Sequence, residues 1–221
     1  MLPSNDHPST EHSMIISYMT LRKAVGVLGM VMPIVLAIGY LIAGGGTEIK
    51  GSISHYYHSP MRDFFVGLLC AVGLFMFCYK GPEKVDGIAG NLAGTFAIGT
   101  ALLPTYNGDT PVDDAAALIG QFHLAAATAL FLVLSYFSLR LFTKTKPDQP
   151  PGRMKLRRNR VYRICGFAML VFLALIALYL VLLKGRMSWL DQAKPVFWLE
   201  TLALWAFGFS WLTKGELILG D

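Results

Sequence analysis

Six ionisable side chains in this chain have the chemistry of a binding, acid–base or metal site and lie in or beside strongly apolar stretches. They are His55, His58, Arg62, Asp63, His123 and Glu200. Imidazole and carboxylate groups accept and release protons and are common ligands of divalent metals. An ionisable group in a membrane segment is costly and usually has a partner or a function. We therefore interpret these residues as a candidate polar pocket.

His55 and His58 are three residues apart, a spacing that lets both rings reach one metal ion. His123 could complete a three-histidine set, with Asp63 or Glu200 as the accompanying carboxylate and base. The same segment also fits a membrane-surface loop whose histidines and tyrosines lie among lipid headgroups. The sequence leaves both interpretations open.

His123 and Glu200 lie inside apolar stretches, so each needs a hydrogen-bonding or neutralising partner. The simplest arrangement is a structural hydrogen bond between the two, and the alternatives are a proton relay, a metal ligand or a substrate contact. Arg62 and Asp63 are adjacent, so on a helix they point about 100° apart and do not pair with each other. Arg62 could instead reach the membrane surface, and Asp63 could complement a helix N-terminus.

The composition indicates that lipid surrounds these residues. Of the 221 residues, 54% are hydrophobic and 15% are charged, whereas soluble domains carry roughly 25% charged residues. An apolar run of about 20 residues spans a bilayer as a helix. The pattern predicts an all-α, polytopic membrane helix bundle of about six spans in one domain, 1–221, with close helix packing at the small-xxx-small segment GNLAG. The expected spans cover residues 24–43, 61–79, 87–103, 115–142, 161–183 and 195–213.

Basic residues are distributed unevenly between the two ends of this predicted bundle. Of the 19 Lys and Arg residues, 14 lie on the side of the N-terminus and 5 on the other side. Cytoplasmic loops carry the excess of Lys and Arg, so we expect both termini in the cytoplasm. At 1.5 Å per residue, His123 then lies roughly 12 Å and Glu200 roughly 7 Å along their helices from the extracytoplasmic end. The candidate residues therefore converge on that side.

Several function classes are disfavoured. The net charge of +5 does not indicate a nucleic-acid partner, because the basic residues fall in short segments between apolar runs. The basic run from Arg153 to Arg160 fits a topology signal that meets anionic lipid headgroups. The three cysteines form no CxxC pair, and the sequence has no Walker-type, HExxH, GxSxG or dinucleotide motif. No cofactor is predicted apart from the divalent metal considered above.

The segments SISHYYHSPMRDFFVG, GNLAGTFAIGTALLPT and WLETLALWAFGFSWLTKGE carry a resemblance that covers most of the chain. There the chain is similar to small bacterial multi-span membrane proteins that are grouped as domains of unknown function. The resemblance implies a six-span fold and a location in the bacterial inner membrane. It implies no particular activity.

Ser54, His55 and Asp63 also match the early Ser, His and Asp of a membrane hydrolase superfamily. This more distant similarity is to the alkaline ceramidases and progestin/adipoQ-type receptors, and it implies zinc-dependent hydrolysis of a lipid amide. The chain lacks the late HxxxH pair of that superfamily and has Glu200 in its closing helix instead. It also has six expected spans where the superfamily has seven.

Three functions remain open from the sequence, and only one of them is enzymatic. The first is a pocket that binds, senses or passes a small ligand, a lipid headgroup or a proton, with Glu200 and His123 as an intramembrane switch. The second is a metal-dependent hydrolase acting on lipid, with His55, His58 and His123 as metal ligands. The third is an assembly partner of another membrane protein. Membrane lipids are expected partners in each case, nucleic acid in none, and a homo-oligomer is compatible with all three.

Overall fold

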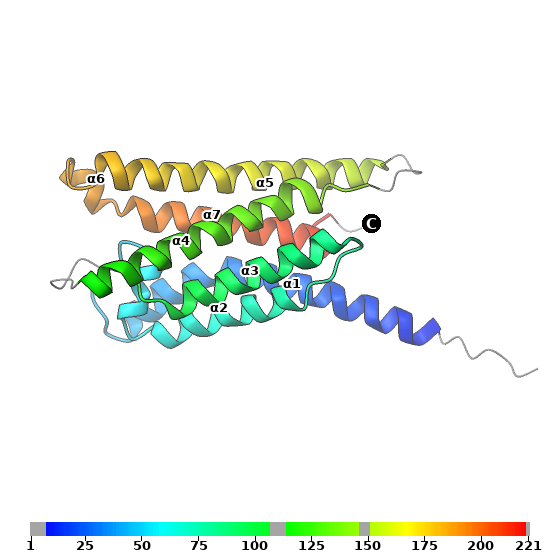
Figure 1. Ribbon diagram of the computed structural model, residues 1–221, viewed down its shortest axis with the longest axis horizontal. Helices are drawn as coiled ribbons and strands as arrows, with labels where there is room; N and C mark the ends of the chain where they lie inside the picture. The colour runs from blue at the N-terminus through cyan, green and yellow to red at the C-terminus, as the bar shows by residue number, and fades with distance from the viewer. Residues whose placement is uncertain (1–7, 107–113, 146–150, 220–221) are drawn as a thin grey trace, which may run out of the picture.

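The fold consists of helices that run back and forth along one common direction. The computed structural model describes residues 8–106, 114–145 and 151–219. Within these residues all regular structure is helical, as the sequence predicts (Figure 1). The long helices are α1 (Pro8–Ile42), α2 (Arg62–Phe77), α3 (Lys84–Leu102), α4 (Asp114–Tyr136), α5 (Arg153–Leu178) and α7 (Pro195–Lys214). The shorter elements are the 3₁₀ helix η1 (Ser54–His58), helix α6 (Ser188–Gln192) and the π-helical turns η2 (Phe137–Leu141) and η3 (Tyr179–Leu183), which continue α4 and α5.

Four of the described helices are long and apolar enough to cross a membrane. They comprise Tyr18–Ile42, Asp114–Leu141, Arg153–Leu183 and Pro195–Lys214, and each covers one predicted span completely or up to its last residue. The other two predicted spans correspond to α2 and α3, which have 16 and 19 residues. At 1.5 Å per residue these helices are about 24 Å and about 28 Å long, somewhat shorter than a hydrocarbon core of about 30 Å.

Two helices begin well before their apolar runs. The first starts at Pro8 rather than near residue 24, and α5 starts at Arg153 rather than near residue 161. The basic residues 153–160 are therefore helical and form the first part of α5. Arginine, lysine, leucine and methionine all favour helix, so α5 extends beyond its apolar part. Hydropathy marks the part of a helix that suits lipid and does not mark where the helix begins.

The six long helices form a closed ring of neighbours in the order α1, α2, α3, α4, α5, α7. Neighbouring helices in this ring are antiparallel (Figure 1). The α4–α5 contact is less extensive than the α3–α4 and α5–α7 contacts on either side of it. In Figure 1, α4 and α5 lie close together where α4 ends and diverge toward the end of the bundle that carries α6. Helices α4 and α5 therefore separate toward that end (Figure 1).

Glycines bring α3 close to α2, as the GNLAG pattern predicts. A Cβ atom at Gly94 would lie 2.8 Å from the carbonyl oxygen of Gly73, and one at Gly90 would lie 2.8 Å from that of Met76. Because both neighbours are backbone atoms, the helices themselves would have to separate to admit a side chain. The pattern in the sequence thus identified a real helix contact.

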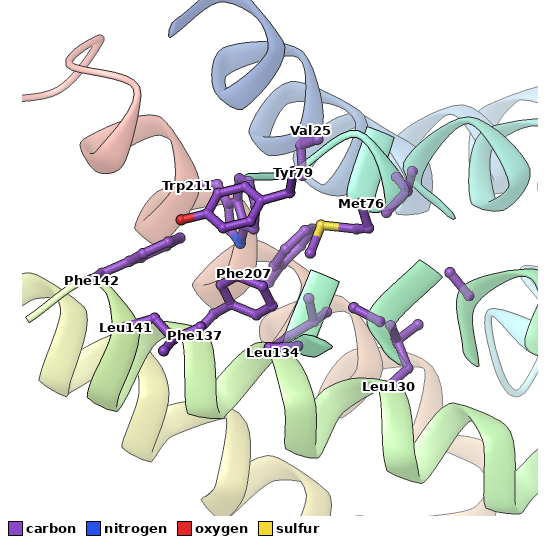
Figure 2. Close-up of a cluster of buried hydrophobic side chains, with 14 of the residues drawn as sticks. Val25, Met76, Tyr79, Leu130, Leu134, Phe137, Leu141, Phe142, Phe207 and Trp211 are labelled. Atoms are coloured by element: carbon purple, nitrogen blue, oxygen red, sulfur yellow. The ribbon is translucent and has the colours of Figure 1, made fainter. Parts of the chain in front are cut away.

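Aromatic rings fill the end of the bundle where α2, α4 and α7 finish (Figure 2). Neighbouring rings in this aromatic cluster have centroids 5.1–5.9 Å apart in edge-to-face or tilted arrangements. Each of the five side chains is at most 3% exposed, so this end is densely packed. The cluster consists of Tyr79, Phe137, Phe142, Phe207 and Trp211.

Charged residues outside the apolar segments tie the end of α4 to the start of α3. Lys144 Nζ lies 3.0 Å from Glu83 and 3.4 Å from Asp86, and these two acids cap α3 reciprocally. Burial alone would lower the pKa of Lys144, but the hydrogen bond to Glu83 and the negative charge of Asp86 outweigh it and raise that pKa. The ion pairs hold the turn between α2 and α3 beside the basic end of the bundle.

Replacement of Gly94 by alanine is expected to destabilise the bundle, because the new methyl group would push α3 from the Gly73 backbone. Overpacking of this kind costs about 1–3 kcal/mol, so the melting temperature of the detergent-solubilised full chain should fall by several degrees. Gly87→Ala is the matched control on the same helix, since a Cβ there meets nothing within 4 Å. Equal melting temperatures for the two variants would show that the α2–α3 approach is looser than described.

Candidate functional site

A cavity of about 590 Å³ lies at the end of the bundle opposite the aromatic cluster. The loop before η1, the residues after α3 and parts of α4, α5, α6 and α7 surround it. The side chains that could do chemistry there come from η1, α4, η3, α6, α7 and the chain on either side of α6. They are His55, His123, Tyr179, Lys184, Asp191, Lys194 and Glu200.

Glu200 connects α7 to the loop between α1 and α2. The Ser52 hydroxyl shares its one proton between the two carboxylate oxygens, at 3.0 and 2.8 Å, and the backbone N–H of Ile53 donates to Oε2 at 2.6 Å. A carboxylate offers about four acceptor positions, so these two donors leave about two of them free. The side chain is half-buried and lines the cavity. Glu200 can therefore accept further hydrogen bonds from a molecule in the cavity.

Local structure holds this loop in place against α7. Helix α7 opens with Pro195 after a left-handed Lys194 (φ 53°), and the Phe197 N–H donates to the Gly51 carbonyl at 3.0 Å. The fully buried Tyr56 packs its ring near those of Tyr40 and Phe197. Burial raises the pKa of the Tyr56 hydroxyl, which accepts a hydrogen bond from the backbone of the loop. The loop and η1 are thus fixed at the edge of the cavity.

His123 lies on α4 and is only 2% exposed. Its Nδ1 is 2.8 Å from the carbonyl oxygen of Leu103, just after the end of α3. A carbonyl only accepts, so Nδ1 carries the proton and Nε2 of the neutral ring is an acceptor. This buried Nε2 has no hydrogen-bond partner, a condition that costs about 1–3 kcal/mol unless something donates to it.

The sequence hypothesis of a direct hydrogen bond between His123 and Glu200 is wrong for the described structure. Each side chain has other protein partners, and the two share only the cavity that both line. His123 on α4 is bonded to the residue after α3, whereas Glu200 on α7 is bonded to the loop between α1 and α2. The two residues therefore line one cavity from different helices without contacting each other.

The other four predicted pocket residues divide between the cavity and the outer surface. His55 lines the cavity, whereas the Nε2 of His58 is bonded to the Thr105 carbonyl at 2.6 Å and does not line it. Arg62 and Asp63 are exposed at the start of α2. The structure brings together His55, His123 and Glu200 but not the other three.

Arg62 forms its contacts with an aromatic side chain next to η1. Its guanidinium lies 4.6 Å from the centre of the Tyr57 ring and donates to the hydroxyl of that residue at 2.9 Å. Arg62 therefore has an aromatic partner outside the cavity. Asp63 lies in the first turn of α2, where its charge complements the helix dipole.

The three histidines proposed as metal ligands do not form one group. In the described parts of the chain, no three His, Cys, Asp or Glu side chains lie close enough together to hold a metal ion. His58 is turned to the chain after α3, and the Nδ1 of His123 is used by the same segment. The residues present therefore do not assemble the predicted three-histidine site, and we derive no step through a metal.

Several polar lining residues were missed because they lie in the connection between α5 and α7, which the sequence presented only as a loop. Asp191 accepts hydrogen bonds from the Tyr179 hydroxyl and from the Gly185 N–H. Lys194 pairs with Glu48 at 2.6 Å, and this hydrogen bond and charge lower the pKa of Glu48. Only a tyrosine at the end of an apolar run could have pointed to such a contact, and that signal is weak.

A second, narrow cavity of about 60 Å³ continues from the first toward the middle of the bundle. The two cavities share Ser54, Ala127 and Glu200 in their linings. Almost all other residues around the narrow cavity are apolar, and it ends at Phe207 of the aromatic cluster. Glu200 therefore lies between the polar lining of the larger cavity and the apolar lining of the narrow one.

Comparison with models of known protein families, with curated protein sequences and with solved structures gave no significant match for this chain.

Proposed function

We propose that this chain is a multi-pass membrane protein that binds a small ligand in the 590 Å³ cavity, with His123 and Glu200 as the groups that hold it. The observation that carries the proposal is the carboxylate of Glu200, which lines the cavity and has acceptor capacity to spare. Buried acceptors in folded proteins almost always have donors. The cavity also has the volume of ordinary small-molecule sites, about 300–1,000 Å³.

The proposed topology has six spans, with both termini in the cytoplasm of a bacterium and the chain in the inner membrane. Helix α1 begins and α7 ends at the same end of the ring, and that end carries most of the basic residues. The excess of Lys and Arg favours the cytoplasm for it. The short α2 and α3 are accommodated by modest local thinning of the bilayer. The cavity then opens on the extracytoplasmic side.

Binding is favoured over passage of a cargo because the two ends of the bundle differ. Beyond Glu200 the space narrows to about 60 Å³ with an apolar lining, and the aromatic cluster follows with side chains at most 3% exposed. A polar cargo or a proton would need polar groups or water along the whole path. The arrangement supports a site that is entered and left from one side.

Reporter fusions test the topology. Alkaline phosphatase joined after Gly81, between α2 and α3, and after Asp221 should be inactive, because both positions are proposed to lie in the cytoplasm. The same enzyme joined after Met187, between α5 and α7, should be active. An active fusion after Gly81 together with an inactive one after Asp221 would mean that α2 and α3 do not both cross the membrane.

A thermal-shift panel of polar small molecules tests the binding itself. Using the purified full chain, we expect at least one member among amines, amino acids, sugars and nucleosides to raise the melting temperature by several degrees. Stabilisation should be lost in Glu200→Gln and His123→Ala and retained in Asp63→Asn, an exposed acid at the same end outside the cavity. If no compound discriminates between wild type and Glu200→Gln, the cavity is not a binding site.

A further inference from the structure

The outer wall of the cavity is apolar where α4 and α5 face each other. Leu124 and Ala127 contribute from α4, and Ile176 and Leu180 from the end of α5 and η3. Leu124 is 51% exposed, so this apolar wall is accessible there. This is the part of the ring where α4 and α5 diverge (Figure 1). Both helices are among the four that suit lipid, so the opening faces the bilayer.

The inner wall carries acceptors and a negative charge. Glu200 lies there, and no ion pair to Glu200 occurs among the described residues. Of the two lysines that line the cavity, Lys194 is already paired with Glu48, and Lys184 is exposed. The inner wall therefore suits a group with several N–H donors and a positive charge, and an ammonium has three such donors and no acceptor.

From these two walls we infer that the ligand is a single-chain amphiphile with a primary-amine head, which enters from the bilayer between α4 and α5. Its head meets Glu200, and its chain lies along Leu124, Ala127 and Ile176. This inference rests on the proposed function and names the chemical class of the ligand. A cavity of about 590 Å³ is sized for one drug-sized molecule, which fits a head with one chain.

Other headgroup chemistries fit the inner wall less well. A carboxylate or phosphate head would place a second negative charge beside Glu200, and it would find a free ammonium only at the exposed Lys184. A hydroxyl head supplies only one donor, whereas about two acceptor positions of Glu200 are free. An amine without a chain would leave the apolar α4–α5 wall in contact with water.

Native mass spectrometry of the full chain in an uncharged detergent tests this class directly. The probes are decylamine, decanol and decanoate, which share one chain, together with propylamine, which has the head and almost no chain. We expect decylamine to bind at least tenfold more tightly than each of the other three. In Glu200→Gln this preference should fall at least tenfold, whereas Asp63→Asn should keep it.

A second variant tests the apolar wall between α4 and α5. Ala127→Leu places a larger side chain in the apolar wall of the cavity and should weaken the binding of decylamine at least tenfold. This test does not depend on whether Glu200→Gln folds. Equal binding of decylamine, decanol and decanoate to wild type would overturn the inference, and so would undiminished preference in a folded Glu200→Gln. If propylamine binds as tightly as decylamine and depends on Glu200, the cavity is a binding site for a soluble amine, which retains the proposed function and refutes the amphiphile.

Discussion

The contact between Glu200 and the first loop is the interaction on which the cavity depends. A carboxylate within an apolar helix must find donors, and a helix cannot supply them because its own N–H groups are used within it. Here the donors come from Ser52 and from the Ile53 backbone, 148 and 147 residues away in sequence. The requirement of one acidic group thus fixes where the loop lies, and with it η1 and one side of the cavity.

The bundle has two unlike ends as a result. Interlocked rings fill one end, and glycines at α2–α3 draw neighbouring helices close. At the other end α4 and α5 separate, and the space between them is bordered by polar groups from five segments (Figure 1). Dense packing at one end and the separation of α4 and α5 at the other suit a protein that binds a molecule entering from one side.

Hydropathy and charge predicted much of this arrangement. Four apolar runs coincide with helices that can cross a membrane, and GNLAG identified the α2–α3 contact. His123 and Glu200 were placed near one end by counting residues along their helices, and both line the cavity there. These successes depend on periodicity and length, which a single sequence carries.

The remaining features depend on rotation and on local folding, which a sequence pattern does not fix. Each residue turns a helix by about 100°, so the depth of Asp63 could be estimated but not its outward direction. His58 turned to the Thr105 carbonyl because a chain leaving α3 needs partners for its backbone. The Tyr179–Asp191 contact requires the short helix α6, which the hydropathy of the sequence does not predict.

A double-mutant cycle between Ser52 and Glu200 measures the central contact most directly. The free energies of unfolding of wild type, Ser52→Ala, Glu200→Gln and the double variant would be compared by reversible detergent unfolding of the full chain. A hydrogen bond to a charged group predicts a coupling of about 1 kcal/mol or more. Strictly additive effects of the two substitutions would contradict the account, because the loop would then be held in place without Glu200.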